Sequence, residues 1–223
     1  MDHIELRALG HWFEGRSQRG ERKTIHLFDN LNLTVRAGRS HAILGPSGAG
    51  KSSLLAMIAA LERPKAGEVA IQLDGKVADA ISLRRRSGFV FQQFHLLPEL
   101  DALGNVALPL RLRGDGEARE KARHWLDRVG LSARAAHRPN QLSGGEQQRL
   151  AIARAFVAEP AFVFADEPTG NLDQHTAAYI GELLFGCVQE QGSALVLVTH
   201  SNTLSRMADC RHQLSGGRLE LLA

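Results

Sequence analysis

The chain contains 223 residues, carries a formal net charge of +3, and is 43% hydrophobic. This size allows one compact domain, or a domain with an additional lobe, around a substantial core. Basic and acidic residues are interspersed, so the chain lacks the concentrated basic face typical of nucleic-acid-binding proteins.

Cysteine usage and the apolar runs limit where the chain is expected to act. Cys187 and Cys210 are far apart and neither belongs to a CxxC pair, so neither a zinc site nor a disulfide scaffold is expected. This cysteine usage fits a reducing, cytosolic location. Residues 1–5 show no basic segment leading into an apolar run, so no signal peptide is expected. The longest apolar stretches, such as 194–198, are far shorter than the roughly 20 residues of a membrane-spanning helix.

Strand patterns dominate the first 91 residues. Strands are predicted over residues 4–9, 25–35, 40–44, 69–73 and 89–91. The polar insert 15–23 indicates an exposed hairpin loop, and Asp74-Gly75 indicates a turn. A helix is predicted from Lys51 to about Leu61. The basic run 84–86 is interpreted as a solvated loop or strand edge.

The second half alternates helices with strands. An amphipathic helix is predicted over 117–129, with Ala118, Ala122, Trp125, Leu126 and Val129 on its apolar face and Gly130 as its stop. Further helices are predicted after Ser143-Gly144-Gly145 and over 176–190. Apolar strands at 162–165 and 194–198 end at Asp166-Glu167 and Thr199-His200. This alternation, with polar residues at strand ends, indicates an α/β fold with a parallel sheet.

Residues 45–52 match the phosphate-binding pattern GxxxxGK[ST] and lie between a predicted strand and a predicted helix. The nucleotide-binding set is Gly45, Pro46, Ser47, Gly48, Ala49, Gly50, Lys51, Ser52 and Ser53. Glycines let backbone N–H groups converge on a phosphate, and the helix N-terminus adds a favourable dipole. We expect Lys51 to reach the β- and γ-phosphates of ATP and Ser52 to bind Mg²⁺.

Two carboxylates follow the apolar strand at 162–165. Asp166 is expected to hold the Mg²⁺ shell, and Glu167 to orient or polarise the water that attacks the γ-phosphate. On their own these residues are equally consistent with solvated acids at a strand end. Their combination with a phosphate-binding loop favours the catalytic interpretation.

A second helix start, Ser143-Gly144-Gly145-Glu146, also combines a hydroxyl group with glycines. Free N–H groups and a serine hydroxyl can bind a phosphate there, or the serine can simply cap the helix. A cap requires the serine but not two glycines, so the sequence favours a second phosphate site.

The order of these motifs resembles that of the ABC ATPases. LSGGEQQR at 142–149 is similar to the signature motif of that family and lies between the phosphate loop and FVFADE. Gln92 in GFVFQ resembles the Q-loop glutamine, Asn171-Leu172-Asp173 the D-loop, and His200 in VLVTH the switch histidine. The resemblance covers nearly the whole chain. It implies an α/β P-loop NTPase (RecA-like) parallel-sheet core with an antiparallel β subdomain, over 1–91 and 159–223, and an α-helical subdomain over 92–158.

The resemblance also implies roles for individual residues. Two chains would enclose two ATP molecules head to tail, with the signature helix of each closing on the phosphate loop of the other. Gln92 would contact Mg²⁺ and the attacking water, His200 would bind the γ-phosphate, and Asp173 would link the two sites. Phe13 would stack on adenine, with Trp12 as the alternative and a plain core role also open.

Within the class, three segments are most similar to the group of LolD-type (lipoprotein-release), MacB-type, YbbA-type and FtsE-type ATPases: FHLLPELDALGNVALPL, HRPNQLSGGEQQR and FADEPTGNLD. The sequence departs from the group at Ser201, where Asp is usual, and at Gly104, where Glu is common. Ser201 is expected to soften the setting of the histidine, and Gly104 to cost about 0.5–1 kcal/mol of helix stability.

The resemblance implies an ATPase that drives a separate integral membrane permease from the cytoplasmic face of the bacterial inner membrane. Residues 94–100 would grip a cytoplasmic helix of the permease, or would belong to the core of the lobe. The alternative is a soluble ABC-type ATPase acting in assembly or on nucleic acid without a permease. Nucleic-acid partners are not expected, because the chain has one cassette and no room for the long inserts of such relatives.

Overall fold

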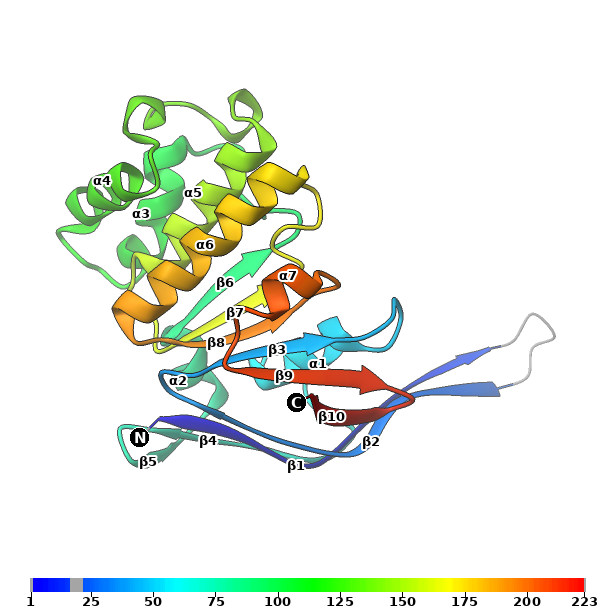
Figure 1. Cartoon of the computed structure of the whole chain (residues 1–223). Helices are drawn as coiled ribbons and strands as arrows, with labels where there is room; N and C mark the ends of the chain where they lie inside the picture. Colours follow the sequence, from blue (N-terminus) through cyan, green and yellow to red (C-terminus); the bar gives the residue numbers. More distant parts are fainter. Residues whose placement is uncertain (1, 17–21, 223) are drawn as a thin grey trace. The chain divides into compact units, whose positions relative to one another are not determined.

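The computed structural model describes residues 2–16 and 22–222 (Figure 1). Residues 17–21 of the predicted hairpin loop lie outside the described residues. The chain forms two compact units, which we name unit 1 (Met1–Arg85 with Val196–Ala223) and unit 2 (Arg86–Leu195). The predicted helical lobe over 92–158 falls entirely within unit 2, and its separation from the remaining residues of that unit stays a prediction.

Unit 1 contains the antiparallel sheet that the family resemblance implies. Its strand order is β2-β1-β4-β5. The strands are β1 (His3–Arg16), β2 (Arg22–Arg36), β4 (Ala66–Leu73) and β5 (Lys76–Ala78). The first two are longer than expected, because their pairing continues through register shifts between Leu6 and Trp12. Asp74 and Gly75 have φ angles of 52° and 72°, which confirms the predicted turn.

The second sheet of unit 1 carries the phosphate loop. Strand β3 (Ser40–Leu44) is buried at all five positions and pairs in parallel with β9 (Cys210–Ser215). The edge strand β10 (Arg218–Leu222) pairs antiparallel with β9 (Figure 1). On the other side of β3 lies β8 (Ala194–Val198), whose last three residues belong to this unit.

Three helices of unit 1 differ from the sequence prediction. Helix α1 (Lys51–Ile58) ends three residues early, because the chain turns at Ala60 with φ 53°. The basic run was expected in a solvated loop or at a strand edge, but Arg84 and Arg85 lie in helix α2 (Ala80–Arg85), where Arg84 donates to the Ala60 carbonyl at 2.6 Å. Helix α7 (Asn202–Ser205) was not anticipated.

Unit 2 combines parallel strands with most of the helices. Strand β6 (Ser87–Phe91) pairs in parallel with β7 (Phe162–Asp166). The helices are α3 (Ala102–Leu112), α4 (Ala118–Arg128), α5 (Gly144–Phe156) and α6 (Gln174–Gln191). Two short 3₁₀ helices, η1 (Ser132–Arg134) and η2 (Pro139–Gln141), lead towards α5. Figure 1 shows α3 and α4 grouped with α5, and α6 running beside α5.

The core of unit 2 confirms the amphipathic pattern of α4. All five residues predicted on its apolar face are buried, and Gly130 ends the helix with φ 69°. Trp125 stacks on Phe156 of α5, with ring centroids 5.8 Å apart. Burial of such aromatic surfaces fixes α4 against α5, the helix that begins at the signature motif. Within residues 2–16 and 22–222, no helix is long and apolar enough to span a membrane.

Candidate functional site

The phosphate loop adopts the backbone conformation that its sequence predicts. Gly48 and Gly50 have φ angles of 79° and 90°, a region that residues with a Cβ rarely adopt. Gly45 packs so close to β9 that a Cβ there would collide with the Leu214 carbonyl oxygen. Gly50 caps α1 without a side-chain hydrogen bond. Because the first N–H groups of a helix lack intrahelical acceptors, this start suits an anion.

Lys51 lies over its own loop. Its ammonium group donates to the carbonyl oxygens of Gly45 at 2.9 Å and Pro46 at 3.1 Å, and its side chain is buried. The same Nζ lies 3.2 Å from Nε2 of His200, so unit 1 brings the predicted switch histidine to the phosphate loop. At this contact the imidazole nitrogen accepts and the ammonium donates.

Ser201, the residue after the histidine, has a clear structural role. Its hydroxyl oxygen accepts from Leu204 N at 3.2 Å and caps α7, and its own N–H donates to Thr199 Oγ1. Serine and aspartate are comparable N-cap residues. The serine therefore performs the capping that an aspartate would perform, which argues against a softer setting for His200.

The two predicted carboxylates end β7 in unit 2. Asp166 is the last residue of the strand, and Glu167 follows with φ 45°. A left-handed conformation at a residue with a long side chain is strained, and such strain concentrates at functional sites. The Gly170 N–H donates to Glu167 O at 3.0 Å, and the buried Gln148 side chain donates to Pro168 O at 2.6 Å. These contacts hold the turn that positions Glu167.

Gln92 and the D-loop segment form one hydrogen-bonded group within unit 2. Gln92 Nε2 donates to Asn171 Oδ1 at 3.0 Å, and Asn171 Nδ2 donates to Gln92 O at 3.1 Å. A Cβ at Gly170 would lie 3.0 Å from Gln92 Nε2, so glycine admits the glutamine there. Asp173 caps α6 by accepting from Thr176 N at 3.0 Å, and hydrogen bonding to Thr176 lowers the pKa of its carboxyl group.

The signature segment begins α5 as a complete capping box. Ser143 Oγ accepts from Glu146 N at 3.3 Å, and Glu146 Oε2 accepts from Ser143 N at 2.8 Å. The Ser143 N–H lowers the pKa of the Glu146 carboxyl group, which favours its ionised form. Capping, which the sequence disfavoured as an explanation for the serine, is thus present.

The two glycines of the signature have different environments. A Cβ at Gly145 would lie 2.8 Å from Thr176 Cγ2, so packing against α6 requires this glycine. At Gly144 the nearest atom would be 3.6 Å away, which is ordinary contact. Packing therefore explains Gly145, and it leaves Gly144 as the glycine that helix packing does not require.

The two candidates for adenine stacking lie on β1. Phe13 is 46% exposed and makes an edge-to-face contact with His11, with ring centroids 5.0 Å apart. Trp12 is less exposed and lies against His26. Consecutive strand residues point to opposite faces, so only one of the two can serve a given ligand. The role of Phe13 stays a prediction.

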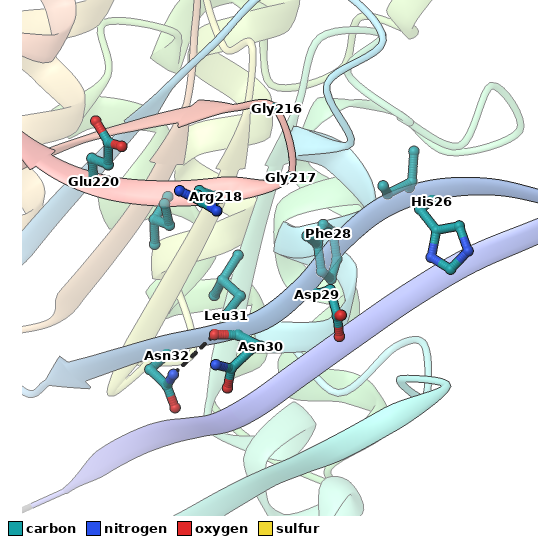
Figure 2. A pocket seen from close by; sticks show the side chains of 12 residues that line it. His26, Phe28, Asp29, Asn30, Leu31, Asn32, Gly216, Gly217, Arg218 and Glu220 are labelled. Atoms are coloured by element: carbon teal, nitrogen blue, oxygen red, sulfur yellow. Dashed lines mark hydrogen bonds between the residues drawn. The ribbon is translucent and has the colours of Figure 1, made fainter.

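A polar groove of about 660 Å³ lies elsewhere in unit 1, between β2 and the β9–β10 hairpin (Figure 2). Asn32 Nδ2 donates to Asn30 O at 3.0 Å, and its Oδ1 accepts from Ala8 N at 2.9 Å. None of the predicted site residues lines this groove. Through these two hydrogen bonds Asn32, which lines the groove, stabilises the bulged pairing of β1 with β2.

Sequence reasoning missed several residues that hold the site. Gln148 supports the Glu167 turn, Asn171 holds Gln92, and Arg154 and Asn105 hold the segment that follows Gln92. Gln148, Asn171 and Asn105 lie within segments that the resemblance singled out. Arg154 lies outside those segments, and its carbonyl partners are 59 and 60 residues away, so no local pattern marks it.

A strand–loop–helix phosphate site, with a carboxylate pair closing another strand, defines a P-loop nucleotide-hydrolysing protein. Residues 28–170 match the family model "ABC transporter". The chain is 47% identical over 205 residues to the lipoprotein-releasing system ATP-binding protein LolD of Bordetella pertussis, covering 88% of each chain. It is 45% identical over 220 residues to LolD of Acinetobacter baylyi, covering 94% of each.

The chain is also similar to solved structures of ABC cassettes. The dimeric structure of MJ0796, described as a bacterial ABC transporter cassette, matches with a TM-score of 0.83 and 38% identity over 99% of both chains. A post-hydrolysis state of that cassette, bound to ADP and Pi, matches equally well at 36% identity. The chain belongs to the ABC transporter family, and it is an ATP-binding and ATP-hydrolysing cassette of that family.

Proposed function

We propose that this chain is the ATPase subunit of a LolD- or MacB-type export complex, in which it drives a separate integral membrane permease. The observation that carries the proposal is the similarity to ATP-binding proteins of lipoprotein-releasing systems, which extends over 88% to 94% of the chain. Each of the two relatives in Bordetella and Acinetobacter is named as the ATP-binding protein of a lipoprotein-releasing system. The complex would work at the cytoplasmic face of the inner membrane, to which the permease attaches the chain.

The functional unit is a homodimer. The phosphate loop has a lysine and an uncapped helix start, whereas the signature segment has a capped start and no lysine. One ATP held by the first can use the second from another copy, which accounts for both. Support comes from the MJ0796 cassette, which is described as dimeric.

Within each site the residues take distinct roles. The phosphate loop from Gly45 to Ser53 binds the phosphates, and Glu167 orients the attacking water. His200 contacts the γ-phosphate from its place beside Lys51. Gln92 couples the water to the D-loop through Asn171, and Asp173 caps α6 at the dimer interface. These roles combine contacts observed within unit 1 and within unit 2, and we propose that they apply in the closed dimer.

The donor set also fits Mg²⁺. This ion prefers hard oxygen ligands and takes few from protein, the others being water and phosphate oxygens. Ser52 offers a hydroxyl and Asp166 a carboxylate, and Gln92 offers its amide oxygen because its Nε2 already donates to Asn171. When bound, the ion would neutralise charge on the transferred phosphoryl group. These three residues would hold it.

The direct test of the catalytic assignment is Glu167→Gln. The amide keeps the size of the side chain but removes its basicity, so ATP binding should persist while turnover falls at least about 100-fold. We expect the variant to elute as a stable dimer with ATP in size-exclusion chromatography. Turnover equal to that of the wild type would overturn the role of Glu167.

The permease is tested by affinity capture from a detergent extract of the native membrane. Recovery of a stoichiometric integral membrane protein supports the proposal. Recovery of the dimer alone, with full ATPase activity, supports instead a soluble ABC-type ATPase that acts without a permease.

A further inference from the structure

The segment after Gln92 contains two consecutive residues in a conformation that their side chains disfavour. Phe94 and His95 have φ angles of 57° and 48°. Left-handed φ values are uncommon for residues with a Cβ, and a bulky residue such as phenylalanine is an outlier there. Such a pair persists only where surrounding contacts determine it.

Arg154 of α5 supplies those contacts. Its Nη1 donates to His95 O at 2.6 Å and its Nη2 donates to Phe94 O at 2.8 Å. The guanidinium fork thus spans the two carbonyls of the strained pair. Burial lowers the pKa of this guanidinium. The two backbone carbonyls are the hydrogen-bond partners that hold it in place.

Asn105 of α3 fixes the next part of the segment. It is fully buried, and its Oδ1 accepts from Leu97 N at 2.8 Å. Its Nδ2 lies within hydrogen-bonding distance of the carbonyls of Leu97, Leu100 and Asp101, at 3.0 to 3.2 Å. The backbone polar groups turn inward, while Leu97 remains 40% exposed and Pro98 and Glu99 are exposed.

The hydrogen bonds of Arg154 to the carbonyls of Phe94 and His95, which we call the clamp, also connect this segment to the signature motif. Arg154 lies on the helix that begins at Gly144, and a Cβ at Gly144 would lie 4.0 Å from Phe94 Cζ. The Phe94 ring therefore lies near the start of α5, and its carbonyl oxygen accepts from Arg154 in the body of α5. A displacement of the α5 helix would carry the segment with it.

We propose that Arg154 is a positioning residue, which holds Phe94 and His95 in their left-handed conformation and thereby presents residues 97–99, preformed, to the permease. This inference rests on the proposed function for the identity of the partner. The conformational part concerns the chain alone, so the two can fail separately.

The first experiment measures hydrogen–deuterium exchange of the full chain without a partner. Arg154→Lys keeps the charge but replaces the planar fork by a single ammonium group, which cannot span both carbonyls in the same way. Amides of residues 94–100 should exchange about tenfold faster, with the melting temperature nearly unchanged. Arg113→Lys, which alters another guanidinium–carbonyl contact of unit 2, to Ala158 O, should leave this segment unaffected.

A second pair of variants keeps the test valid even if Arg154→Lys folds poorly. His95→Val and His95→Gly both remove the exposed ring and its contact with Phe91. Valine opposes a left-handed φ and glycine accepts it, so only the valine variant should accelerate exchange of the segment. Equal behaviour of the two variants, or unchanged exchange in Arg154→Lys, would overturn the clamp.

The second experiment measures the ATPase activity of the wild type and of Arg154→Lys as increasing amounts of the captured permease are added. If the docking conformation is populated less, the half-saturating permease concentration rises about tenfold, while the maximal rate and the KM for ATP stay unchanged. Faster exchange with an unchanged half-saturating concentration would overturn the positioning role and leave the proposed function standing. Failure to capture any permease would count against the proposed function and leave the exchange result interpretable.

Discussion

The helix starts of α1 and α5 satisfy the same requirement in opposite ways. Both begin with glycines, and both must provide for N–H groups that have no acceptor within the helix. Gly50 opens α1 without a side-chain cap, whereas Ser143 and Glu146 cap α5 reciprocally. The first start offers backbone N–H groups and one lysine to a phosphate. The second is stabilised by its own side chains, and its capping box uses the N–H groups of Ser143 and Glu146.

The largest effect that separates the two starts is expected at Lys51. Lys51→Met removes the cation from the phosphate loop and should lower ATP turnover by about 100-fold or more, as the loss of a preorganised donor does. Stability should change little, since Gly45 is only half-buried and Pro46 is exposed, so water can replace the lysine at their carbonyl oxygens. ATPase assays with thermal melts check both. A turnover loss that merely followed unfolding would break the comparison.

A second difference between the two helix starts is the buried histidine pair in the sheet that leads to α1. Strand β3, which leads into the phosphate loop, carries His41, whose Nδ1 lies 3.1 Å from Nε2 of the equally buried His212 on β9. Burial, with a further contribution from His212, lowers the pKa of His41 to about 4 from 6.5. Asp209 acts in the opposite direction, and Arg39 and Arg36 add to the lowering. Burial also lowers the pKa of His212.

Acid should therefore weaken unit 1 through this pair. Because the folded pKa is depressed, the unfolded chain binds more protons between pH 6.5 and about 4, and stability falls as pH falls through that window. At pH 5 the loss from His41 is about 2 kcal/mol relative to pH 7.5. Urea unfolding at both pH values measures it. The double variant His41→Val, His212→Val should have a flatter pH dependence, and an identical dependence would contradict the assignment.

The smallest effects distinguish the two signature glycines. Gly145→Ala should destabilise the chain by about 1 kcal/mol, because the new methyl group would press on Thr176. Gly144→Ala meets only ordinary contacts, so stability should be retained while turnover falls about tenfold if a phosphate approaches there. Thermal melts and ATPase assays of the two variants form a matched pair. Full activity of Gly144→Ala would remove the argument for a phosphate at the signature.

Continuous apolar runs between turn residues made some elements predictable. Strands β3 and β8 have the predicted bounds, and the apolar face of α4 is buried as predicted. No bounds were predicted for α3, because Gly104 and Pro109 interrupt its helical pattern. A local cap compensates: Asp101 Oδ1 accepts from Gly104 N, and a Cβ at Gly104 would lie 3.0 Å from that oxygen. The expected cost of this glycine is thus offset by the cap that it admits.

For the site, the sequence predicts which residues take part but not their conformations. The phosphate-loop spacing predicts the role of Lys51, the end of an apolar strand that of Glu167, and the family resemblance that of Gln92, and these roles stay predictions. The left-handed φ of Glu167 lies in a turn that Gln148 supports, and the contact between Lys51 and His200 joins residues far apart in the chain. Neither a glycine nor a charge pattern marks them beforehand.

The cap formed by Ser201 has a consequence for comparing genomes. A search pattern that requires aspartate after the switch histidine would pass over this chain, although the hydroxyl group accepts the same backbone N–H of a short helix. A pattern that admits any good N-cap residue, namely serine, threonine, asparagine or aspartate, follows the physical requirement more closely. Chains that carry serine at this position would then be retained in the comparison.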